Sequence, residues 1–493
     1  MDLARALRIG IYTGIFAIPF IGLIVANNFF FPFISGKNFT FRIIVEIVFA
    51  LWVVLALISP EYRPKKSAAL LIGGAFVLSL GISTLLAENP SKAFWSNFER
   101  MEGYITLIHL AMYVTVLTTM MKTEELWKKF FLTSIGASTI IALYGCLQLL
   151  GAFTINQGGV RVDGTFGNAT YLAVYMLIHA FITILALFRW TKGARLMQAL
   201  LSIALVLQIT MVFFAATRGT ILGLVGGLLL AGLIFAFSRG AGSARKIGIG
   251  FIIAVAVVGG IFFGVKDTAY VQNHAVLSRI ASISLAQGET RFTIWSMALS
   301  GFYERPLFGW GQEGFNFVFN EQYVPTLYSQ EPWFDRAHNI LLDWLVAGGI
   351  IGAVLYLSFY GVLIFYLWRP RNNFDISERA VLTGLLAGYA FHNLFVFDNL
   401  MSYVLFMAIF SYITVRSVPQ TGWGAPLPAS TAQVALPVVG ILLAVVLYVA
   451  NAPGISSATG LIQALSPQSG GVPQNFEILK GVVDSSDGLG RQE

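Results

Sequence analysis

Long apolar segments recur along almost the whole sequence, and they constrain the fold more than any other feature. A transmembrane helix needs about 20 mostly apolar residues. Segments of this kind occur at 9–30, 42–58, 68–87, 104–121, 130–150, 169–188, 196–216, 219–238, 247–265, 349–368, 380–397, 401–416 and 434–450. Apolar residues make up 57% of the chain and charged residues 11%, which excludes an ordinary soluble domain. The sequence predicts an all-α polytopic membrane protein with about 12–13 transmembrane helices.

The positions of lysine and arginine predict how these helices are oriented. With the N-terminus inside, the inner loops hold 18 basic and 6 acidic residues, a net charge of +12. The rest of the chain holds 13 basic and 18 acidic residues, a net charge of −5. The overall charge of +7 therefore reflects topology, and no nucleic-acid partner is expected.

This topology divides the chain into four parts, two of them in the membrane and two outside. They are 1–265 with nine transmembrane helices, the external loop 266–338 with amphipathic helices, 339–450 with the remaining transmembrane helices, and the external linker or tail 451–493. The apolar segment that follows the external loop is interrupted at Gly348-Gly349, where we expect a break.

Two arginines lie at the outer ends of predicted helices. Arg161 belongs to a glycine-rich loop, where it either binds an anion, pairs with Asp163 or lies at the lipid headgroups. Arg218 occupies a turn of a few residues between two apolar helices. An ionisable side chain at this depth is costly unless it meets a partner or an anionic ligand, although it can also snorkel to the surface.

A third arginine, Arg291, lies in the first turn of a predicted amphipathic helix in the external loop. Apolar residues recur there at helical spacing, namely Phe292, Trp295, Leu299 and Phe302. A cation in the first turn opposes the helix dipole unless an anion meets it. That anion is either Glu289 or a bound ligand.

His338 ends the external loop and is the candidate proton acceptor, because histidine exchanges protons near neutral pH. If this segment is helical, Asp335 reaches the imidazole and sets its tautomer. Alternatively, His338 and Asn339 belong to a helix cap.

Arginines recognise phosphate bidentately, so several arginines beside one histidine suit a pyrophosphate substrate and a proton acceptor. Aromatic residues of the same loop offer faces for sugar rings, or form an interfacial belt: Trp310, Phe315, Tyr323, Tyr328 and Trp333. Packing or helix–helix hydrogen bonds explain the other polar residues in or near the membrane: Glu46, His109, His179, His392, Asn393 and Asp398. A proton relay is the alternative for Glu46, and lining of the same outer cavity is the alternative for His392, Asn393 and Asp398. No nucleotide-binding or metal-binding motif is present in the sequence, and we expect no cofactor.

Several motifs, in order and with suitable spacing, resemble the O-antigen ligase and polymerase superfamily. They are Thr217-Arg-Gly219, Arg291-Phe-Thr-Ile-Trp295, Pro306-Leu-Phe-Gly-Trp-Gly311 and Ala337-His-Asn339 followed by Gly348-Gly-Ile-Ile-Gly352. The loop from Arg161 to Asn168 is similar to a further family element. The resemblance extends over roughly residues 150–415.

The resemblance implies a metal-independent, inverting membrane glycosyltransferase of the GT-C class in the bacterial cytoplasmic membrane. It implies transfer of a glycan from an undecaprenyl-pyrophosphate carrier to a hydroxyl of lipid A-core, a protein or another glycan at the outer face, as in lipopolysaccharide assembly. Arg218 and Arg291 are then expected to bind the donor pyrophosphate, with Arg161, Asp335 and Trp310 as further substrate-binding residues, and His338 to take the acceptor proton.

Other functions remain open from the sequence. A repeat-unit polymerase or a protein O-oligosaccharyltransferase would use the same donor. A transporter or flippase for lipid-linked glycans would need no chemistry, and its usual internal repeats are not evident in the sequence.

Overall fold

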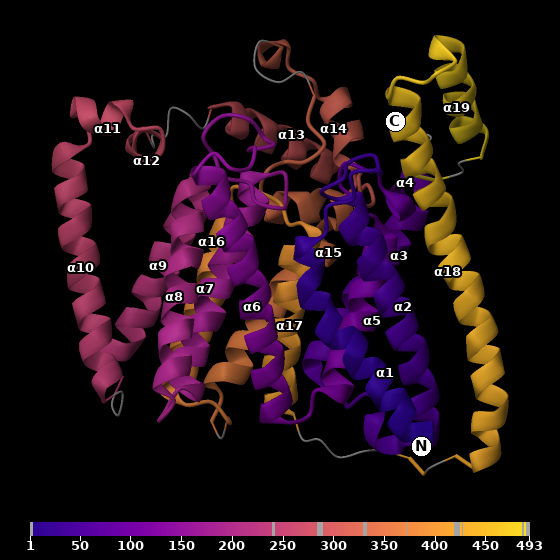
Figure 1. Cartoon of the computed structure of the whole chain (residues 1–493), viewed down its shortest axis with the longest axis horizontal. Coiled ribbons are helices and arrows are strands. Elements are labelled where there is room, and N and C mark those ends of the chain that lie inside the picture. Colours follow the sequence, from indigo (N-terminus) through magenta and orange to yellow (C-terminus); the bar gives the residue numbers. More distant parts are fainter. Residues whose placement is uncertain are drawn as a thin grey trace.

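The computed structural model describes residues 3–238, 242–282, 289–328, 333–370, 372–418, 424–425, 427–485 and 488–489. In these ranges the regular structure is helical throughout, without a strand. Figure 1 shows the long helices side by side in one bundle, with shorter helices at its upper end.

Eleven helices in the described residues are long and apolar enough to cross a membrane. They are α1 with its continuation η1 (Leu3–Ala17 and Ile18–Leu23), α2 (Ser35–Ile58), α3 (Ala68–Leu85), α6 (Glu124–Leu149), α7 (Ala169–Trp190), α8 (Arg195–Phe214), α9 (Arg218–Phe237), α10 (Ser243–Val265), α15 (Ile340–Trp368), α17 (Leu400–Ser417) and α18 (Ala429–Leu465). Two further helices of the bundle are shorter or less apolar, α5 (Tyr104–Met120) and α16 (Ile376–Asn393). Each predicted apolar segment thus coincides with a helix, and the prediction of an all-α polytopic membrane protein is confirmed.

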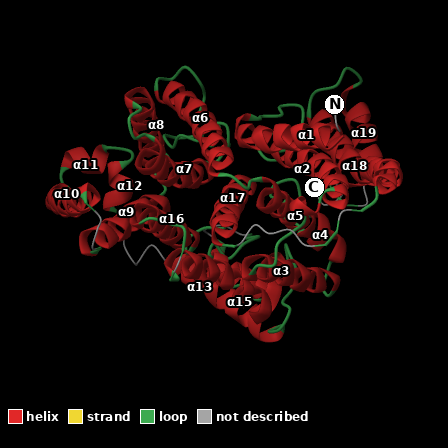
Figure 2. Ribbon diagram, turned by 90° about the horizontal axis from the view of Figure 1, so that it is seen from below, coloured by secondary structure: helices red, strands yellow, loops and turns green. Residues whose placement is uncertain are grey.

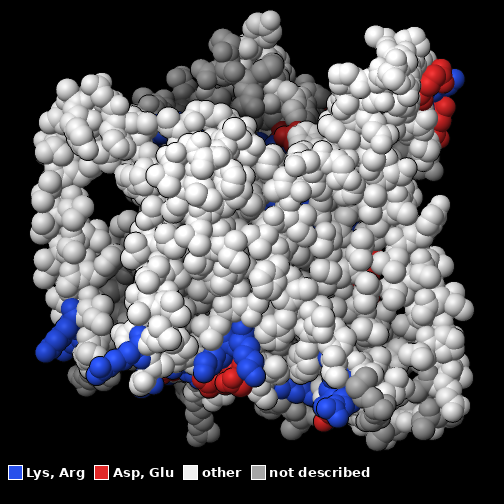
Figure 3. All heavy atoms as spheres, viewed as in Figure 1, with Lys and Arg blue, Asp and Glu red and all other residues white. Residues whose placement is uncertain are grey.

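Charge distinguishes the two ends of the bundle. Lysine and arginine gather at the lower end in Figure 3, which is where α1 begins, and we call it the basic end. The opposite end, called the site end below, carries the short helices that precede α15. These are α11 (Ala269–Asn273), α12 (Leu277–Ala281), α13 (Glu289–Glu304), α14 (Phe315–Glu321) and η4 (Pro325–Leu327). The charge asymmetry agrees with the orientation predicted from the loops.

Burial separates a central pair of helices from two peripheral ones. In the most apolar part of α7 and α17, 83% and 89% of the residues are buried. The corresponding fractions are 6% for α10 and 0% for α18, which lie at opposite edges of the bundle in Figure 2. The bundle is therefore built around α7 and α17, and α10 and α18 expose most of their surface.

Glycines bring α9 directly against α16. A Cβ atom at Gly223 would lie 2.5 Å from the carbonyl oxygen of Gly388, and one at Gly227 would lie 2.4 Å from that of Gly384. Small residues at such a crossing let two backbones approach closely in a membrane. This contact fixes the height of Arg218, which is the first residue of α9.

The predicted break in α15 is present at Gly349, whose φ of 61° and ψ of −163° are not helical. The loop that follows α13 packs on this break: the Trp310 amide donates to the Val346 carbonyl (2.7 Å), and the Ile350 amide donates to the Pro306 carbonyl (2.8 Å). Gly309 permits the contact, because a Cβ atom there would lie 2.2 Å from the Val346 oxygen. The glycines of the two motifs thus join the loop of residues 266–338 to the start of α15.

The loop of residues 266–338 has its own hydrophobic core at the site end. Its buried members are Ile294, Met297, Ala298, Trp310, Phe315, Val318, Phe319, Leu327, Phe334, Ala337 and Val346. The predicted amphipathic helix corresponds to α13, and its Phe292 and Leu299 are exposed, as expected for an interfacial helix. The core positions α13 beside the segment that carries His338.

The C-terminal part differs from the linker that its composition predicted. Helix α18 continues to Leu465, and α19 (Gly471–Ser485) folds back along it. Phe39, Phe98, Leu461 and Val482 share a small buried cluster that anchors this hairpin at the site end. Apolar residues at helical spacing, separated by glycine and serine, account for the part of α18 after residue 451, which the composition did not predict, whereas Phe476 and the residues after it do show a helical pattern.

Candidate active site

His338 lies in a short non-helical segment immediately before α15, with a left-handed φ of 53°. Asn339 caps α15, because its side-chain oxygen accepts from the amides of Leu341 (3.0 Å) and Leu342 (3.3 Å). The predicted helix cap is thus confirmed for Asn339. A left-handed conformation costs free energy in a residue with a side chain, so the surrounding contacts must hold it.

Four contacts hold the His338 segment in place. The Trp295 indole of α13 donates to the Ala337 carbonyl (3.1 Å), and the Ala337 amide donates to the Asp343 carboxylate (2.7 Å). The Arg336 guanidinium donates to the carboxylates of Glu102 (3.0 Å) and Glu313 (2.7 Å), all of them buried. The backbone on both sides of His338 is therefore fixed by neighbouring elements.

A backbone carbonyl and two aromatic rings surround the His338 imidazole. Its Nδ1 lies 3.1 Å from the Arg336 carbonyl oxygen, and its ring makes edge contacts with Phe334 (5.6 Å) and Phe397 (5.2 Å). A carbonyl only accepts, so Nδ1 carries the proton of the neutral ring and Nε2 is left as an acceptor. Burial lowers the pKa of His338 below its ordinary value, and the nearby guanidinium of Arg291 adds to this effect, against the Arg336 carbonyl and Asp335, which raise it. The ring is accordingly neutral at pH 7 and able to accept a proton.

Arg291 lies one turn before Trp295 on α13, so the two side chains share a face of that helix. Its guanidinium reaches solvent, yet the surrounding protein lowers its pKa by desolvation, and Arg218 lowers it further. In the part of the chain that the structure describes, no hydrogen bond or ion pair reaches the Arg291 guanidinium. The side chain of Glu289, its expected partner, lies outside the described residues.

Arg218 follows a tight turn in which Ala216 has a left-handed φ of 49°. Its Nε donates to the Arg279 carbonyl (2.7 Å) and its Nη2 donates to the Ser282 hydroxyl (2.8 Å), so α12 closes over the start of α9. Arg279 donates in return to the Ala216 carbonyl (3.5 Å). The guanidinium groups of Arg218 and Arg279 are close enough to repel each other.

Arg161 is held beside them by neutral oxygens. It donates to the Ala215 carbonyl (3.0 Å) and to the hydroxyls of Thr170 (3.3 Å) and Thr217 (2.9 Å). The alternative pairing with Asp163 does not occur, because that carboxylate accepts from Gln148 and from the Gln157 amide. Burial lowers the pKa of Arg161, and repulsion from Arg279 lowers it further.

Together the four arginines Arg161, Arg279, Arg218 and Arg291 form what we call the arginine row, in which each group repels the next. Arg291, at one end of the row, is close enough to His338 for its charge to lower the pKa of the imidazole. Among the described residues, Arg161, Arg279 and Arg291 form no ion pair with a carboxylate. Like charges gathered in this way favour a bound anion.

Two predicted substrate-binding residues have other partners. Asp335 accepts two hydrogen bonds from Arg100, at 2.5 and 3.1 Å, and so does not orient the imidazole through a hydrogen bond. Burial would raise the pKa of Asp335, but the Arg100 guanidinium outweighs it and the pKa lies below its ordinary value. Trp310 is 3% exposed, donates to the Gly301 carbonyl and is covered by Arg305 at 4.0 Å. Trp310 therefore offers no free face for a sugar ring, contrary to our expectation.

The remaining sequence candidates divide between structural contacts and exposed positions. His392 bonds to Thr220 (2.9 Å), and Asp398 accepts from Tyr389, Asn393 and Ser402, so both join helices. Glu46 contacts His109 (2.8 Å), and His179 contacts Ser134 (2.8 Å). Phe315 is buried, whereas Tyr323, Tyr328 and Trp333 are exposed. In the described ranges, no group of three or more His, Cys, Asp or Glu side chains is arranged to hold a metal ion.

Sequence reasoning missed the residues that support the site from other segments: Arg100, Glu102, Arg279, Glu313 and Arg336. The sequence signal for these supporting residues was weak. Charged residues in short loops at the predicted outer side, as at Arg100 and Glu102, resemble ordinary loop residues until the fold brings them to His338.

The fold and the site define a polytopic membrane protein with an arginine row beside a neutral histidine at one end of its helical bundle. Residues 203–357 match the family model described as O-antigen ligase. This match confirms, for residues 203–357, the resemblance to the O-antigen ligase superfamily that was found in the sequence. The matched range holds Arg218, Arg279, Arg291 and His338, whereas Arg161 precedes it. No curated protein matches the sequence. The family supports a membrane glycosyltransferase of ligase or polymerase type.

Proposed function

We propose that this protein is a metal-independent, inverting glycosyltransferase that transfers a glycan from an undecaprenyl-pyrophosphate carrier to an acceptor hydroxyl. The observation that carries the proposal is the arginine row beside His338. A pyrophosphate supplies several anionic oxygens to such a row, and guanidinium forks bind phosphate in bidentate fashion.

In this scheme the arginine row binds the donor pyrophosphate and stabilises the charge that develops on it. The acceptor oxygen attacks the anomeric carbon, the bond from that carbon to the phosphate oxygen breaks, and the pyrophosphate leaves as an anion. Attack from the face opposite the leaving group inverts the anomeric centre. Fixed cations near a departing anion lower the barrier because they are already oriented before the reaction.

His338 takes the proton of the acceptor hydroxyl at Nε2. Its Nδ1 faces the Arg336 carbonyl, so the free lone pair is on the other nitrogen. The lowered pKa keeps the ring neutral before the reaction, and the negative charge of a bound pyrophosphate favours the imidazolium that forms. The proton then passes from His338 to solvent.

The position of the arginine row supports a lipid-linked donor. Helix α10 packs on α9 through Gly248 and Gly232 and then diverges, so that a gap separates its upper part from the bundle in Figure 3. Exposed apolar side chains such as Ile253, Val257 and Ile261 line α10. A long isoprenoid chain entering from the membrane here would place its pyrophosphate near Arg218. The basic end, placed inside by the charge rule, would leave this site at the outer face.

The test is glycan transfer by the purified protein in detergent with EDTA, comparing wild type with Arg291→Ala. Loss of one charge-stabilising donor costs about 2–4 kcal/mol of transition-state stabilisation, so kcat should fall roughly 30- to 700-fold. Arg305→Ala is the matched control, because Arg305 directly follows α13 but pairs with Glu88, outside the arginine row. Equal turnover of Arg291→Ala and wild type would remove Arg291 from the mechanism.

A further inference from the structure

A small polar pocket lies next to the segment that carries His338. Its volume is about 10 Å³, and a cavity of roughly this size, ~10–15 Å³, holds one water molecule. Gln312 from the loop after α13, Arg336, Asp343 and Trp344 from the start of α15, and Tyr403 from α17 all line it. Segments far apart in the sequence thus enclose one polar space.

Four residues that line this pocket each have a buried polar atom without a hydrogen-bond partner in the ranges that the structure describes. The atoms are Nε2 of Gln312, Nε of Arg336, Oδ2 of Asp343 and Nε1 of Trp344. Their residues are 3%, 7%, 6% and 4% exposed, respectively. Buried polar atoms without a partner are rare in folded proteins. Four of them around one pocket therefore indicate a bound molecule that completes their hydrogen bonds.

The four atoms define the chemistry of that molecule. Gln312, Arg336 and Trp344 offer N–H donors, whereas the free oxygen of Asp343 accepts when the carboxyl is ionised. A water molecule can accept from two of these donors and donate to Asp343. A cation would be repelled by the Arg336 guanidinium, and an anion would be repelled by the Asp343 carboxylate. The volume and the polar atoms together therefore favour a single water.

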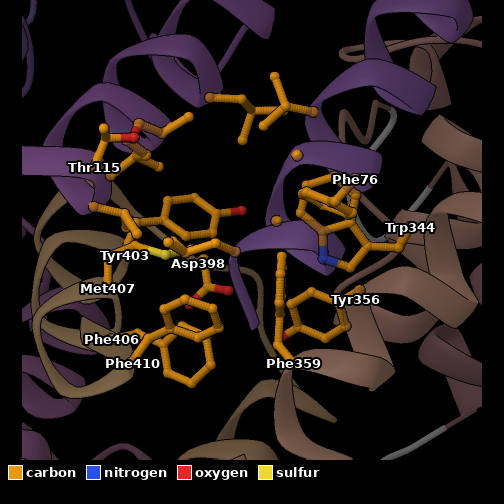
Figure 4. A pocket seen from close by; sticks show the side chains of 18 of the residues that line it. Phe76, Thr115, Trp344, Tyr356, Phe359, Asp398, Tyr403, Phe406, Met407 and Phe410 are labelled. Atoms are coloured by element: carbon orange, nitrogen blue, oxygen red, sulfur yellow. The ribbon is translucent and has the colours of Figure 1, made fainter. Parts of the chain in front are cut away.

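A larger, apolar cavity of about 200 Å³ shares Trp344 and Tyr403 with the polar pocket. In Figure 4, Phe76 and Trp344 lie on one side of this cavity and Tyr403 lies on the other. Phe76 and Phe359 line the larger cavity but not the polar pocket. The two spaces can therefore be distinguished by the residues that belong to only one of them.

Two of the four residues also hold the backbone on either side of His338. The Arg336 carbonyl oxygen lies 3.1 Å from Nδ1 of the imidazole, and the Asp343 carboxylate accepts from the Ala337 amide at 2.7 Å. His338 itself has a left-handed φ of 53°, which its surroundings must hold. A molecule that bridges Nε of Arg336 and Oδ2 of Asp343 would join these two anchors.

We propose that the pocket binds one ordered water molecule, which bridges Arg336 and Asp343 and so positions His338. Arg336 and Asp343 are then positioning residues, because they act on the reaction through the backbone that carries the imidazole. This positioning role rests on the proposed transferase function, whereas the water site does not.

The first experiment is X-ray radiolysis of the full chain in nanodiscs, followed by mass spectrometry, because hydroxyl radicals formed from a bound water oxidise the side chains beside it. We expect oxidation of Trp344, although it is only 4% exposed. Trp310 is the matched control and should stay unmodified, since it is 3% exposed and its indole already donates to the Gly301 carbonyl. Equally low oxidation of both tryptophans would overturn the water site. Oxidation of Phe76 and Phe359 to the extent of Trp344 would assign the water to the larger cavity and overturn it as well.

Substitutions at Ala347, which lines the pocket and is 6% exposed, separate the space of the water from its hydrogen bonds. Ala347→Val fills the space with methyl groups, whereas Ala347→Ser places there a hydroxyl that both donates and accepts. Both variants should lower the oxidation of Trp344 about tenfold, the factor that corresponds to ~1.4 kcal/mol. Ala353→Val is the control and should leave it unchanged, because Ala353 is 5% exposed on α15 and lines neither cavity.

Glycan transfer by the same variants tests the positioning role. Ala347→Val should lower kcat about tenfold or more with unchanged donor affinity, because a small displacement of a catalytic group is costly. Ala347→Ser should keep kcat within about twofold of wild type, since its hydroxyl replaces the bridge. Wild-type kcat in Ala347→Val, or an equal loss in both variants, would overturn the bridge. If wild type transfers no glycan, the proposed function fails, and the oxidation of Trp344 still decides whether the pocket holds water.

Discussion

The ion cluster behind His338 yields a quantitative prediction, because two carboxylates share one guanidinium nitrogen. Nη2 of Arg336 lies 3.0 Å from Glu102 and 2.7 Å from Glu313. Burial raises the pKa of Glu102 to about 8, helped by Glu313 and opposed by Arg336. At pH 7 Glu102 is therefore mostly protonated, and Glu313 carries the charge that balances Arg336.

The two carboxylates should respond differently to neutralisation. Glu102→Gln resembles the protonated form and keeps an acceptor, so it should cost less than about 1 kcal/mol of unfolding free energy at pH 7. Glu313→Gln removes the charged partner, which for a buried pair costs about 3–5 kcal/mol. Glu102 can replace it by ionising, at a cost of about 1.4 kcal/mol for one pH unit below its pKa. We therefore expect about 1.5–3 kcal/mol for Glu313→Gln and about 3–5 kcal/mol for the double variant.

The assay is unfolding in mixed micelles of increasing SDS fraction, followed by tryptophan fluorescence, for wild type, both single variants and the double variant. The double variant should be less stable than the sum of the single effects predicts, by about 1 kcal/mol or more. Glu102 has a folded pKa above its ordinary value of 4.5, so its contribution is complete below pH 4.5 and is lost as pH rises through about 8. Glu102→Gln should escape this alkaline loss. Equal costs for the two single variants at pH 7, or strict additivity, would refute the assignment of the proton.

Two further predictions concern the site and its support. Because burial and Arg291 lower the pKa of His338, the acid limb of kcat/KM should lie below pH 6.5, with activity falling as pH falls; a pH–rate profile checks this, and an acid limb well above 6.5 would contradict it. Gly309→Ala should destabilise the protein by at least ~2 kcal/mol, because its Cβ would lie 2.2 Å from a carbonyl oxygen at a φ of 69°. Gly136→Ala, with no neighbour within 4 Å, is the control for the same thermal unfolding measurement, and equal unfolding midpoints would show that the approach at Gly309 is not needed.

Much of the fold was predictable because the membrane requires long apolar helices whose ends are marked by charge. The break at Gly349, the cap at Asn339 and the helix that carries Arg291 all follow from local rules and are present. The tail after residue 451 was misread because glycine and serine count as linker signals by composition, although their spacing permits a helix.

The site was predictable only in part, because its residues come from segments far apart in the sequence. Arg218, Arg291 and His338 were found through motifs. Their grouping with Arg279 depends on α12 closing over α9, which no local pattern shows. The contact between Arg100 and Asp335 spans 235 positions, so only the fold reveals that this carboxylate is already paired.

The central claim is that His338 removes the acceptor proton next to a pyrophosphate held by arginines. The most direct measurement is transfer from an undecaprenyl-pyrophosphate glycan by purified protein in EDTA, with wild type and His338→Ala compared for turnover and for donor binding. The account predicts that wild type transfers the glycan despite EDTA, whereas His338→Ala binds the donor with unchanged affinity and transfers none. Turnover of His338→Ala at the wild-type rate would contradict it, and the proton would have to leave through another group.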